Sequence, residues 1–342
     1  MKSMGAVFSL SFGLLLSQSV LALEIYRTGN PADVVTPTRE SLCLSGGGYD
    51  EEWIDGWRYL IHSSGGGDIL IIRADGERGE YEHWIYTDSD HHRFPRVNSV
   101  TTISLSSKRD GDEPAVVNQI LKAEMIFFAG GDQSLYIDWL GGTRAERALN
   151  HQLHIKKIPF AGTSAGMAFL AGIDFSARYE SPSEEGGIVT SEDVLKNPTG
   201  HFIDLDPRVL VPKHMRSVIT ETHFAARNRQ ARVVGFMANA IYKKLASVQQ
   251  IRAVAADEDT AVCLNGNGIG RVYGKNEVYF LTANSAPEVI RANAPLEWNN
   301  NQSAVQVKRL RQSNAPFNFK TWSSPDGIEQ FWWVEHGVLK ER

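Results

Sequence analysis

The feature that most constrains the fold is a pattern repeated in the first half of the chain: an apolar run, a glycine-containing turn, then a helical pattern. The runs lack polar/apolar alternation, which is typical of parallel strands covered on both faces. Strands and helices in this rhythm predict an α/β fold with a doubly wound, mainly parallel sheet and helices on both faces. The runs interpreted as strands begin at residues 40, 68, 97, 125 and 158, after an irregular lead.

Three of these runs end in glycines or small polar residues. Residues 46–48, residues 130–133 and Ser164 all come where a predicted strand ends. In open parallel sheets the site lies beyond the carboxyl ends of the strands. We therefore expect the functional site around Ser164.

Residues 162–166 read Gly-Thr-Ser-Ala-Gly, a G-x-S-x-G sequence between an apolar run and a buried-helix pattern. A serine on such a tight turn has an exposed hydroxyl, and the following backbone N–H groups point at whatever it attacks. Glycines fit on both sides because a side chain there would collide with the facing strand or helix. The pattern indicates a nucleophilic serine; a glycine-rich helix start with a capping serine is the alternative.

Serine hydrolysis also needs a base, an acid that orients the base, and donors for the oxyanion. Residues 217–224 are interpreted as a strand with His223 at its end. His223 is the candidate base, with a structural histidine as the alternative. Glu258, in the acidic cluster 257–259, is the candidate acid, with a solvated turn as the alternative. The order serine, histidine, glutamate differs from the α/β-hydrolase order and disfavours that fold.

Three arginines follow His223 within a helical pattern over residues 225–245, namely Arg227, Arg229 and Arg232. Arg227 can hold a carboxylate through two parallel hydrogen bonds, which suits an acidic substrate. A solvated helix face with partner acids is the alternative for all three.

From residue 264 onward, glycine and asparagine turns separate alternating strands, a pattern typical of antiparallel hairpins. We expect these hairpins to close one edge of the sheet. The sequence shows no repeat and no clean boundary, so we predict one domain over 23–295 with a C-terminal β-rich extension, 296–342, packed on it. The tryptophans of the extension are expected to be buried there; a substrate-binding edge or a dimer contact is the alternative.

Residues 1–22 have the features of a secretory signal peptide: a basic start, an apolar stretch over 6–16 and a small-residue cleavage site. The apolar stretch is too short to serve as a membrane anchor. We expect an exported protein, periplasmic or secreted, with no membrane anchor after cleavage.

Composition narrows the function classes further. A net charge of −5 gives no electrostatic case for binding nucleic acid or an anionic membrane. The ten histidines show no zinc-type spacing such as H-E-x-x-H. Cys43 and Cys263 both lie in apolar, strand-like runs, and in an exported protein they either pair or remain buried thiols.

Four motifs, in this order, resemble cyanophycinase, a branch of the serine peptidase family that also contains the aspartyl dipeptidases. The match covers about residues 42–281. The motifs are Phe128-Ala-Gly-Gly-Asp-Gln133, Gly162-Thr-Ser-Ala-Gly166, Thr222-His-Phe224 with the three arginines, and Asp257-Glu-Asp-Thr-Ala261.

The resemblance implies a flavodoxin-like sheet related to class I glutamine amidotransferases, with serine in the place of their cysteine. It implies that Ser164 is the nucleophile, His223 the general base and Glu258 the residue that orients the base. It also implies a homodimer and no cofactor or metal.

The same resemblance assigns the remaining site residues. The backbone N–H groups of Gly131 and Ala165 would form the oxyanion hole. Gln133 looks like the substrate-contacting glutamine of the family, and Arg227 like its substrate-binding arginine.

The substrate of the family is cyanophycin, a polyaspartate with arginine on each side-chain carboxyl, which is cleaved to β-Asp-Arg dipeptides. Two departures concern the pocket: Glu221-Thr222 stands where cyanophycinases more usually have Asp-Gln, and Met167 where a small residue is commoner. Three functions follow: cyanophycin hydrolysis, peptidase or isopeptidase action on other Asp-containing or β-linked peptides, and binding without catalysis. The Glu221-Thr222 pair favours the second, and the intact serine, histidine and glutamate speak against the third.

Overall fold

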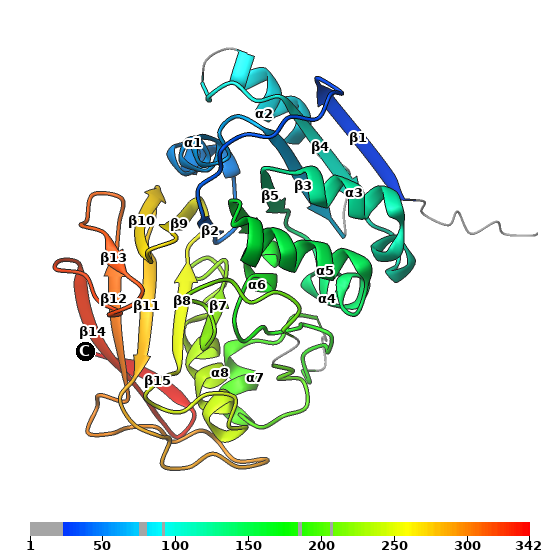
Figure 1. Cartoon of the computed structure of the whole chain (residues 1–342). Coiled ribbons are helices and arrows are strands. Elements are labelled where there is room, and N and C mark those ends of the chain that lie inside the picture. Colours follow the sequence, from blue (N-terminus) through cyan, green and yellow to red (C-terminus); the bar gives the residue numbers. More distant parts are fainter. Residues whose placement is uncertain (1–22, 75–80, 91–92, 184–186, 206–207) are drawn as a thin grey trace, which may run out of the picture.

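The predicted strands of the first half lie side by side in a nine-stranded sheet (Figure 1). The computed structural model describes residues 23–74, 81–90, 93–183, 187–205 and 208–342, so the predicted signal peptide lies outside the described residues. The parallel part has the spatial order β4-β3-β5-β6-β2. Its strands are β2 (Ser41–Ser45), β3 (Asp68–Arg73), β4 (Ser99–Ser104), β5 (Met125–Phe128) and β6 (Phe160–Thr163).

Helices cover both faces of this sheet, which confirms the predicted fold class. Strands β4, β3, β5 and β6 follow the 2-1-3-4 order of flavodoxin-like sheets. Strand β2 takes the fifth place, although it precedes these four strands in the chain. Side chains alternate between two cores, so Ile71 and Phe127 face one side while Ile72 and Phe128 face the other.

The two faces are covered by different helices (Figure 1). One core holds side chains of α1 (Ile54–Ser63) and α2 (Tyr81–Asp90). The other holds side chains of α3 (Pro114–Lys122), α4 (Gln133–Leu140) and α5 (Arg144–His151). Shorter helical segments are η1 (Asp50–Trp53), η2 (Lys108–Asp112), η3 (Gln152–Lys156) and α6 (Ala165–Phe169).

Antiparallel strands close both edges of the first sheet. On one edge, β1 (Glu24–Gly29) pairs with β4, although the sequence predicted an irregular lead there. The residues of β1 are exposed or half-buried, so they carry no apolar run to mark the strand. The other edge is formed by β9 (Thr260–Asn265), β10 (Ile269–Gly274) and β13 (Phe317–Asn318).

The remaining strands form a second, six-stranded sheet, which the sequence did not predict. The expectation that all the late hairpins close an edge of the first sheet is therefore wrong. The residues on the two sides of the acidic cluster 257–259 form strands in different sheets, because the chain crosses between the sheets there. The second sheet has the order β15 (Val338–Glu341), β14 (Ile328–Glu335), β12 (Val305–Leu310), β11 (Val278–Ala283), β8 (Arg252–Ala256) and β7 (Val218–Glu221).

One apolar core joins the two sheets. Val254 and Phe280 of the second sheet belong to the same buried cluster as Leu44 and Phe128 of the first. The other face of the second sheet packs against α7 (Ser191–Lys196) and α8 (Gln230–Tyr242) (Figure 1). Trp298, Trp332 and Trp333 of the C-terminal segment are buried in that core.

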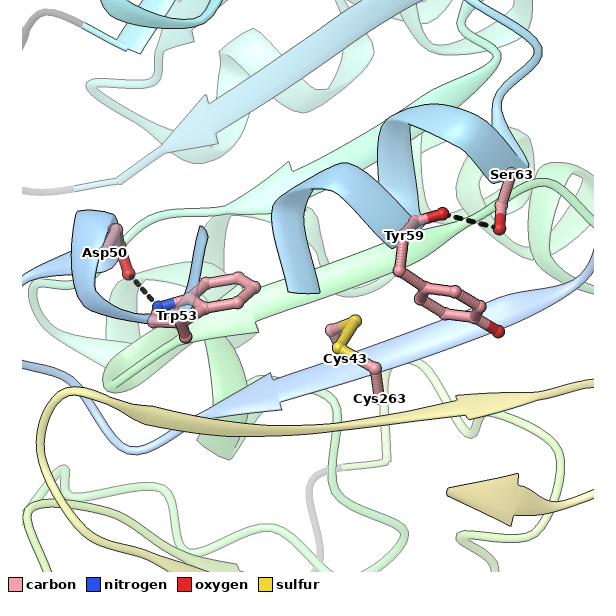
Figure 2. Close-up of a disulfide and its surroundings, with 6 residues drawn as sticks. All are labelled: Cys43, Asp50, Trp53, Tyr59, Ser63 and Cys263. Carbon is pink, nitrogen blue, oxygen red and sulfur yellow. Dashed lines mark hydrogen bonds between the residues drawn. A yellow bond between two sulfur atoms is a disulfide. The ribbon is translucent and has the colours of Figure 1, made fainter. Parts of the chain in front are cut away.

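A disulfide joins Cys43 and Cys263, the two cysteines whose state the sequence left open. They lie directly opposite each other on β2 and β9, and both are buried. The bond lies beneath α1, which approaches closely at Gly56 (Figure 2). A Cβ at Gly56 would lie 3.2 Å from the Cys263 sulfur. Among the described residues, no helix is long and apolar enough to cross a membrane.

Candidate active site

Ser164 lies on a tight turn between β6 and α6, with φ 51° and ψ −114°. Non-glycine residues adopt positive φ at an energetic cost, and such residues cluster at functional sites. The turn needs glycine on both sides of the serine. A Cβ at Gly162 would lie 2.3 Å from the backbone of Gly166. A Cβ at Gly166 would lie 2.1 Å from the carbonyl oxygen of Phe128. Close packing on both sides therefore fixes where the Ser164 hydroxyl points.

The structure brings Ser164, His223 and Glu258 into one hydrogen-bonded chain. The Oγ of Ser164 lies 2.7 Å from Nε2 of His223. The Nδ1 of His223 lies 2.6 Å from Oε1 of Glu258. Both distances are within the range expected of a nucleophile, base and orienting acid.

The three side chains come from different parts of the two sheets. Ser164 follows β6 of the first sheet, and His223 comes two residues after β7 of the second. Glu258 lies in the short crossing between β8 and β9. The hydroxyl of Thr220 on β7 donates to the carbonyl of Met167 in α6, 3.3 Å away, and so joins the serine and histidine segments.

The loop after β2 forms a wall against the imidazole. The His223 N–H donates to the carbonyl of Gly46, 2.7 Å away. A Cβ at Gly47 would lie 2.3 Å from Cε1 of His223, and Gly47 has φ +102°. Only glycine fits there without displacing the imidazole, which explains the glycine run that the sequence analysis noted at this strand end.

The other two acids of the 257–259 cluster hold backbone rather than the imidazole. Asp257 accepts a hydrogen bond from the Ala225 N–H at 2.9 Å, and Asp259 accepts one from the Tyr49 N–H at 2.7 Å. Asp257 therefore fixes the turn that follows His223, and Asp259 fixes the glycine loop. The cluster holds the chain on both sides of Glu258 and is not the solvated turn of the alternative interpretation.

Burial lowers the pKa of His223 below its ordinary value of 6.5. The hydrogen bond to Glu258 opposes this shift in pKa, and the positive charges of Arg227 and Arg229 add to it. The imidazole is therefore neutral at pH 7, which is the form that can accept a proton from Ser164.

A cavity of about 280 Å³, the active-site cavity, opens beside Ser164 and His223. The predicted oxyanion-hole residues, Gly131 and Ala165, both line it. Ala165 is the first residue of α6, so its N–H has no acceptor within the helix. Gln133 also lines the cavity, and its side-chain amide donates to the carbonyl of Phe175 at 3.2 Å.

The three arginines after His223 have two different environments, so the solvated-face alternative is wrong for two of them. Arg229 and Arg232 are only 7% and 3% exposed, and both pair with the buried carboxylate of Glu221. Arg232 binds Glu221 through two nitrogens, at 2.5 and 2.8 Å. Arg229 also donates to the Thr222 carbonyl at 2.9 Å and its hydroxyl at 3.1 Å. Burial lowers the pKa of Arg229 to about 10, so it stays charged at neutral pH.

Arg227 is exposed at the active-site cavity and carries no side-chain hydrogen bond or ion pair within the described residues. Among the described residues, the charged side chains that line the cavity are three arginines and two acids, Asp132 and Glu221. The Asp132 carboxylate caps α4 by accepting from the Ser134 N–H at 2.8 Å. The unpaired guanidinium makes the cavity suited to an anionic group.

Some lining residues were not singled out from the sequence. Phe175, Ala177 and Ile188 form an apolar part of the wall. Residues 176–198 are mostly polar and contain glycines, so no periodic pattern points to single residues there. In the parts of the chain that the structure describes, no group of His, Cys, Asp or Glu side chains is arranged to hold a metal ion.

No protein-family model matches the sequence. Among solved structures, the chain resembles a peptidase from an acI-B1 Actinobacterium, with 18% identity, 82% of this chain and 97% of that one covered, and a TM-score of 0.44. It also resembles a putative peptidase E protein from Listeria monocytogenes EGD-e, with 11% identity, 70% of this chain and 100% of that one covered, and a TM-score of 0.42.

Proposed function

We propose that this protein is an exported serine peptidase that cleaves Asp-containing peptides through Ser164, His223 and Glu258, with cyanophycin as its first candidate substrate. The observation that carries the proposal is the hydrogen-bonded chain from Ser164 through His223 to Glu258. It stands beside a cavity with an unpaired guanidinium, that of Arg227.

In the proposed reaction, Ser164 Oγ attacks the scissile carbonyl carbon while His223 Nε2 takes its proton. Glu258 accepts from Nδ1 and stabilises the imidazolium that forms. The backbone N–H groups of Gly131 and Ala165 stabilise the oxyanion of the tetrahedral intermediate. The C–N bond then breaks, and His223 gives the proton to the leaving amine. Water then attacks the acyl carbon while His223 takes its proton. The bond from that carbon to Ser164 Oγ breaks, and His223 returns the proton to Oγ.

Substrate recognition rests on the charges of the active-site cavity. Arg227 would bind a carboxylate on the acyl side through a bidentate hydrogen bond, that of the arginine branch in cyanophycin or the free carboxylate of the Asp residue in an Asp-Xaa dipeptide. Glu221, which departs from the family pattern, is bound by Arg229 and Arg232, so its charge is neutralised beneath the cavity. Among the described residues that line the cavity, this leaves Arg227 as the guanidinium without a partner.

Export is supported by the disulfide between Cys43 and Cys263. Disulfides form and persist in oxidising compartments, such as the periplasm or the extracellular space. The signal-peptide features of residues 1–22 point the same way.

The experiment is a product assay on insoluble cyanophycin with the purified mature protein, with Ser164→Ala as the control. We expect the wild type to release β-Asp-Arg and the variant to be at least about 10⁴-fold slower, because the nucleophile is lost. A fluorophosphonate probe should label the wild type only. Full activity in Ser164→Ala, or an unlabelled and inactive wild type, would contradict the proposal.

A second candidate function is a peptidase or isopeptidase for other Asp-containing or β-linked peptides. The observation that favours it is the pair Glu221-Thr222, which stands where Asp-Gln is more usual in the resembled family. Thr222 takes the place of that glutamine, and its hydroxyl accepts a hydrogen bond from the buried Arg229. A panel of cyanophycin, β-Asp-Arg, and α-linked and β-linked Asp-Xaa dipeptides separates the two. Turnover of dipeptides without release from cyanophycin would favour the second function.

A further inference from the structure

A short segment between α6 and α7, residues 175–178, forms one wall of the active-site cavity, and we call it the wall segment. The side chains of Phe175 and Ala177 line the cavity. The side chains of Ser176 and Arg178 instead hydrogen-bond to acids that do not line it. One side of the wall segment therefore faces the space for a substrate, while the other side is held by the protein.

The backbone of the wall segment is strained at Ala177, which has φ 54°. A non-glycine residue keeps a positive φ only where the surrounding contacts over-determine it. The Ser176 hydroxyl donates to the Asp204 carboxylate at 2.6 Å, and the Ser176 N–H donates to the Asp204 carbonyl at 2.9 Å. The Arg178 N–H donates to the Ser176 hydroxyl at 3.2 Å. Contacts on both sides therefore hold Ala177 in a conformation that it would not keep without them.

Arg178 ties the wall segment to α4 and to Asp204. Its Nε and Nη2 atoms donate hydrogen bonds to Oδ1 of Asp138 on α4, at 3.1 and 2.6 Å. Its Nη1 atom donates to Oδ2 of Asp204 at 3.0 Å. The hydrogen bond to Asp138 raises the pKa of Arg178 above its ordinary value, so the guanidinium stays charged. A planar guanidinium can bridge two carboxylates in this way, which a lysine ammonium does less well.

Helix α4 holds the wall segment at a second point, close to the proposed oxyanion hole. The side-chain amide of Gln133, the first residue of α4, donates to the carbonyl of Phe175 at 3.2 Å. Gly131 lies two residues before this helix begins. The helix that follows the proposed oxyanion hole therefore also holds the wall segment, at Gln133 and at Asp138.

In the proposed function, both ends of the bound residue are fixed. Its scissile carbonyl lies at Ser164 and its carboxylate at Arg227, and both of these residues line the same cavity as the wall segment. A residue with one more methylene between carbonyl and carboxylate must bend outward, and the wall segment is part of the surface around it. A rigid wall opposes this overpacking, whereas a wall that can move accepts it.

We infer that the wall segment sets the length of the residue that fits between Ser164 and Arg227, and that Arg178 is the positioning residue that holds the wall in place. This inference rests on the proposed function. It predicts that the protein discriminates Asp from Glu on the acyl side, and that this discrimination depends on a residue that does not touch the substrate.

The kinetic test compares Asp-Leu with Glu-Leu, in the α-linked series and in the series linked through the side-chain carboxyl. We expect wild-type kcat/KM to favour Asp-Leu by at least about tenfold, because one methylene changes rates by about this much in a fitted pocket. In Arg178→Gln and in Asp138→Ala the preference should fall to about threefold or less. The double variant should fall no further than Arg178→Gln alone, because both changes break the same contact. The kcat for Asp-Leu should stay within a few-fold, since neither residue touches the reacting atoms.

Arg58→Gln is the matched control, because it breaks a half-exposed pair with Asp55 on α1, 2.7 Å apart, and should keep the wild-type preference. Equal wild-type rates on the two dipeptides, or an unchanged preference in Arg178→Gln, would overturn the inference.

Hydrogen exchange tests the role of Arg178 without any substrate. The Ser176 amide, which donates to the Asp204 carbonyl, should exchange about tenfold faster in Arg178→Gln than in the wild type, because the wall opens more often. The amides of β5 should keep their exchange rates. Unchanged exchange at Ser176 would show that Arg178 does not hold the wall and would overturn the inference.

A binding experiment separates this inference from the proposed function. Ser164→Ala protein is titrated calorimetrically with aspartate and with glutamate, and so is the double variant Ser164→Ala/Arg178→Gln. We expect aspartate to bind more tightly to the first protein and the double variant to lose most of the difference, whether or not any peptide is hydrolysed. Hydrolysis with no discrimination between the two lengths would overturn the inference alone. Discriminating binding with no hydrolysis and no labelling by the fluorophosphonate probe would overturn the catalytic proposal alone.

Discussion

The two sheets hold the side chains of the proposed catalytic residues by different physical means. In the first sheet, Ser164 is fixed by close packing, because Gly162 and Gly166 leave no room for another backbone path. In the second sheet, His223 is fixed by polar contacts: a backbone hydrogen bond to Gly46 and, just before it in the chain, the buried Glu221.

This difference indicates which changes in solution conditions or sequence should affect Ser164 and which should affect His223. Steric fixation survives changes of pH and salt, whereas buried ion pairs depend on every partner being present and charged. The serine should therefore tolerate loss of covalent or electrostatic support elsewhere. The histidine should respond to changes in the charges around it.

The largest effect on kcat should come from Glu258, which lies in the crossing between the two sheets. Glu258→Gln keeps the shape of the side chain but removes the charge that stabilises the imidazolium. We expect kcat to fall by about 10³- to 10⁴-fold with little change in KM. Steady-state kinetics on the best substrate of the panel measures this, with Asp259→Asn as a neighbour that does not touch the imidazole. A loss of less than tenfold in Glu258→Gln would mean that the serine and histidine act without their acid.

The next largest effect concerns Glu221 in the second sheet and the free energy of unfolding. Glu221→Gln leaves the buried guanidinium groups of Arg229 and Arg232 without a counter-charge, so we expect the free energy of unfolding to fall by about 3–5 kcal/mol. We also expect kcat to fall, because Arg229 holds the backbone of Thr222 next to His223. Urea unfolding measures the first change. Glu192→Gln, which breaks an exposed pair with Lys196, is the matched control and should leave the unfolding midpoint almost unchanged.

The matching change in the first sheet is removal of the disulfide. Cys43→Ala/Cys263→Ala should lower the free energy of unfolding by about 2–5 kcal/mol. At temperatures where the variant is folded, kcat should stay within a few-fold of the wild type, because the close packing at Gly162 and Gly166 holds Ser164 without help from the disulfide. Thermal unfolding and kinetics on the same samples measure both quantities. If this variant loses kcat while Glu221→Gln keeps it, the contrast between the two sheets is wrong.

The smallest effect concerns pH. Because burial lowers the pKa of His223, the acid limb of the kcat/KM profile should have its midpoint below pH 6.5. The unfolded chain binds the proton at higher pH than the folded one, so the stability from neutral His223 is complete above pH 6.5 and is lost as pH falls. Arg227→Gln removes a positive charge that lowers this pKa, so the acid limb of the pH–rate profile should move to higher pH. A limb that stays in place would show that Arg227 does not act on the imidazole.

The sequence made the first sheet and the three residues of the hydrogen-bonded chain predictable, because each carries a local signal. Ser164 stands between two glycines, His223 ends an apolar run, and Glu258 interrupts one. The second sheet was not predictable, because alternation marks a strand without showing which strand it pairs with. The edge strand β1 has no apolar run at all, and the partner of Arg232 is Glu221, eleven residues earlier on a different element.

The place of β2 has a consequence for the synthesis of the chain. It is made early, yet in the finished sheet it lies between β6 and β9, and its disulfide partner follows 220 residues later. Until β9 has been translated, a central strand of the first sheet has one edge unpaired, and such edges recruit strands from other chains. The chain up to about residue 265 must therefore avoid pairing with strands of other chains until β9 pairs with β2. If the chain is exported before it folds, as we propose, that delay would be spent in transit rather than in a crowded cytosol.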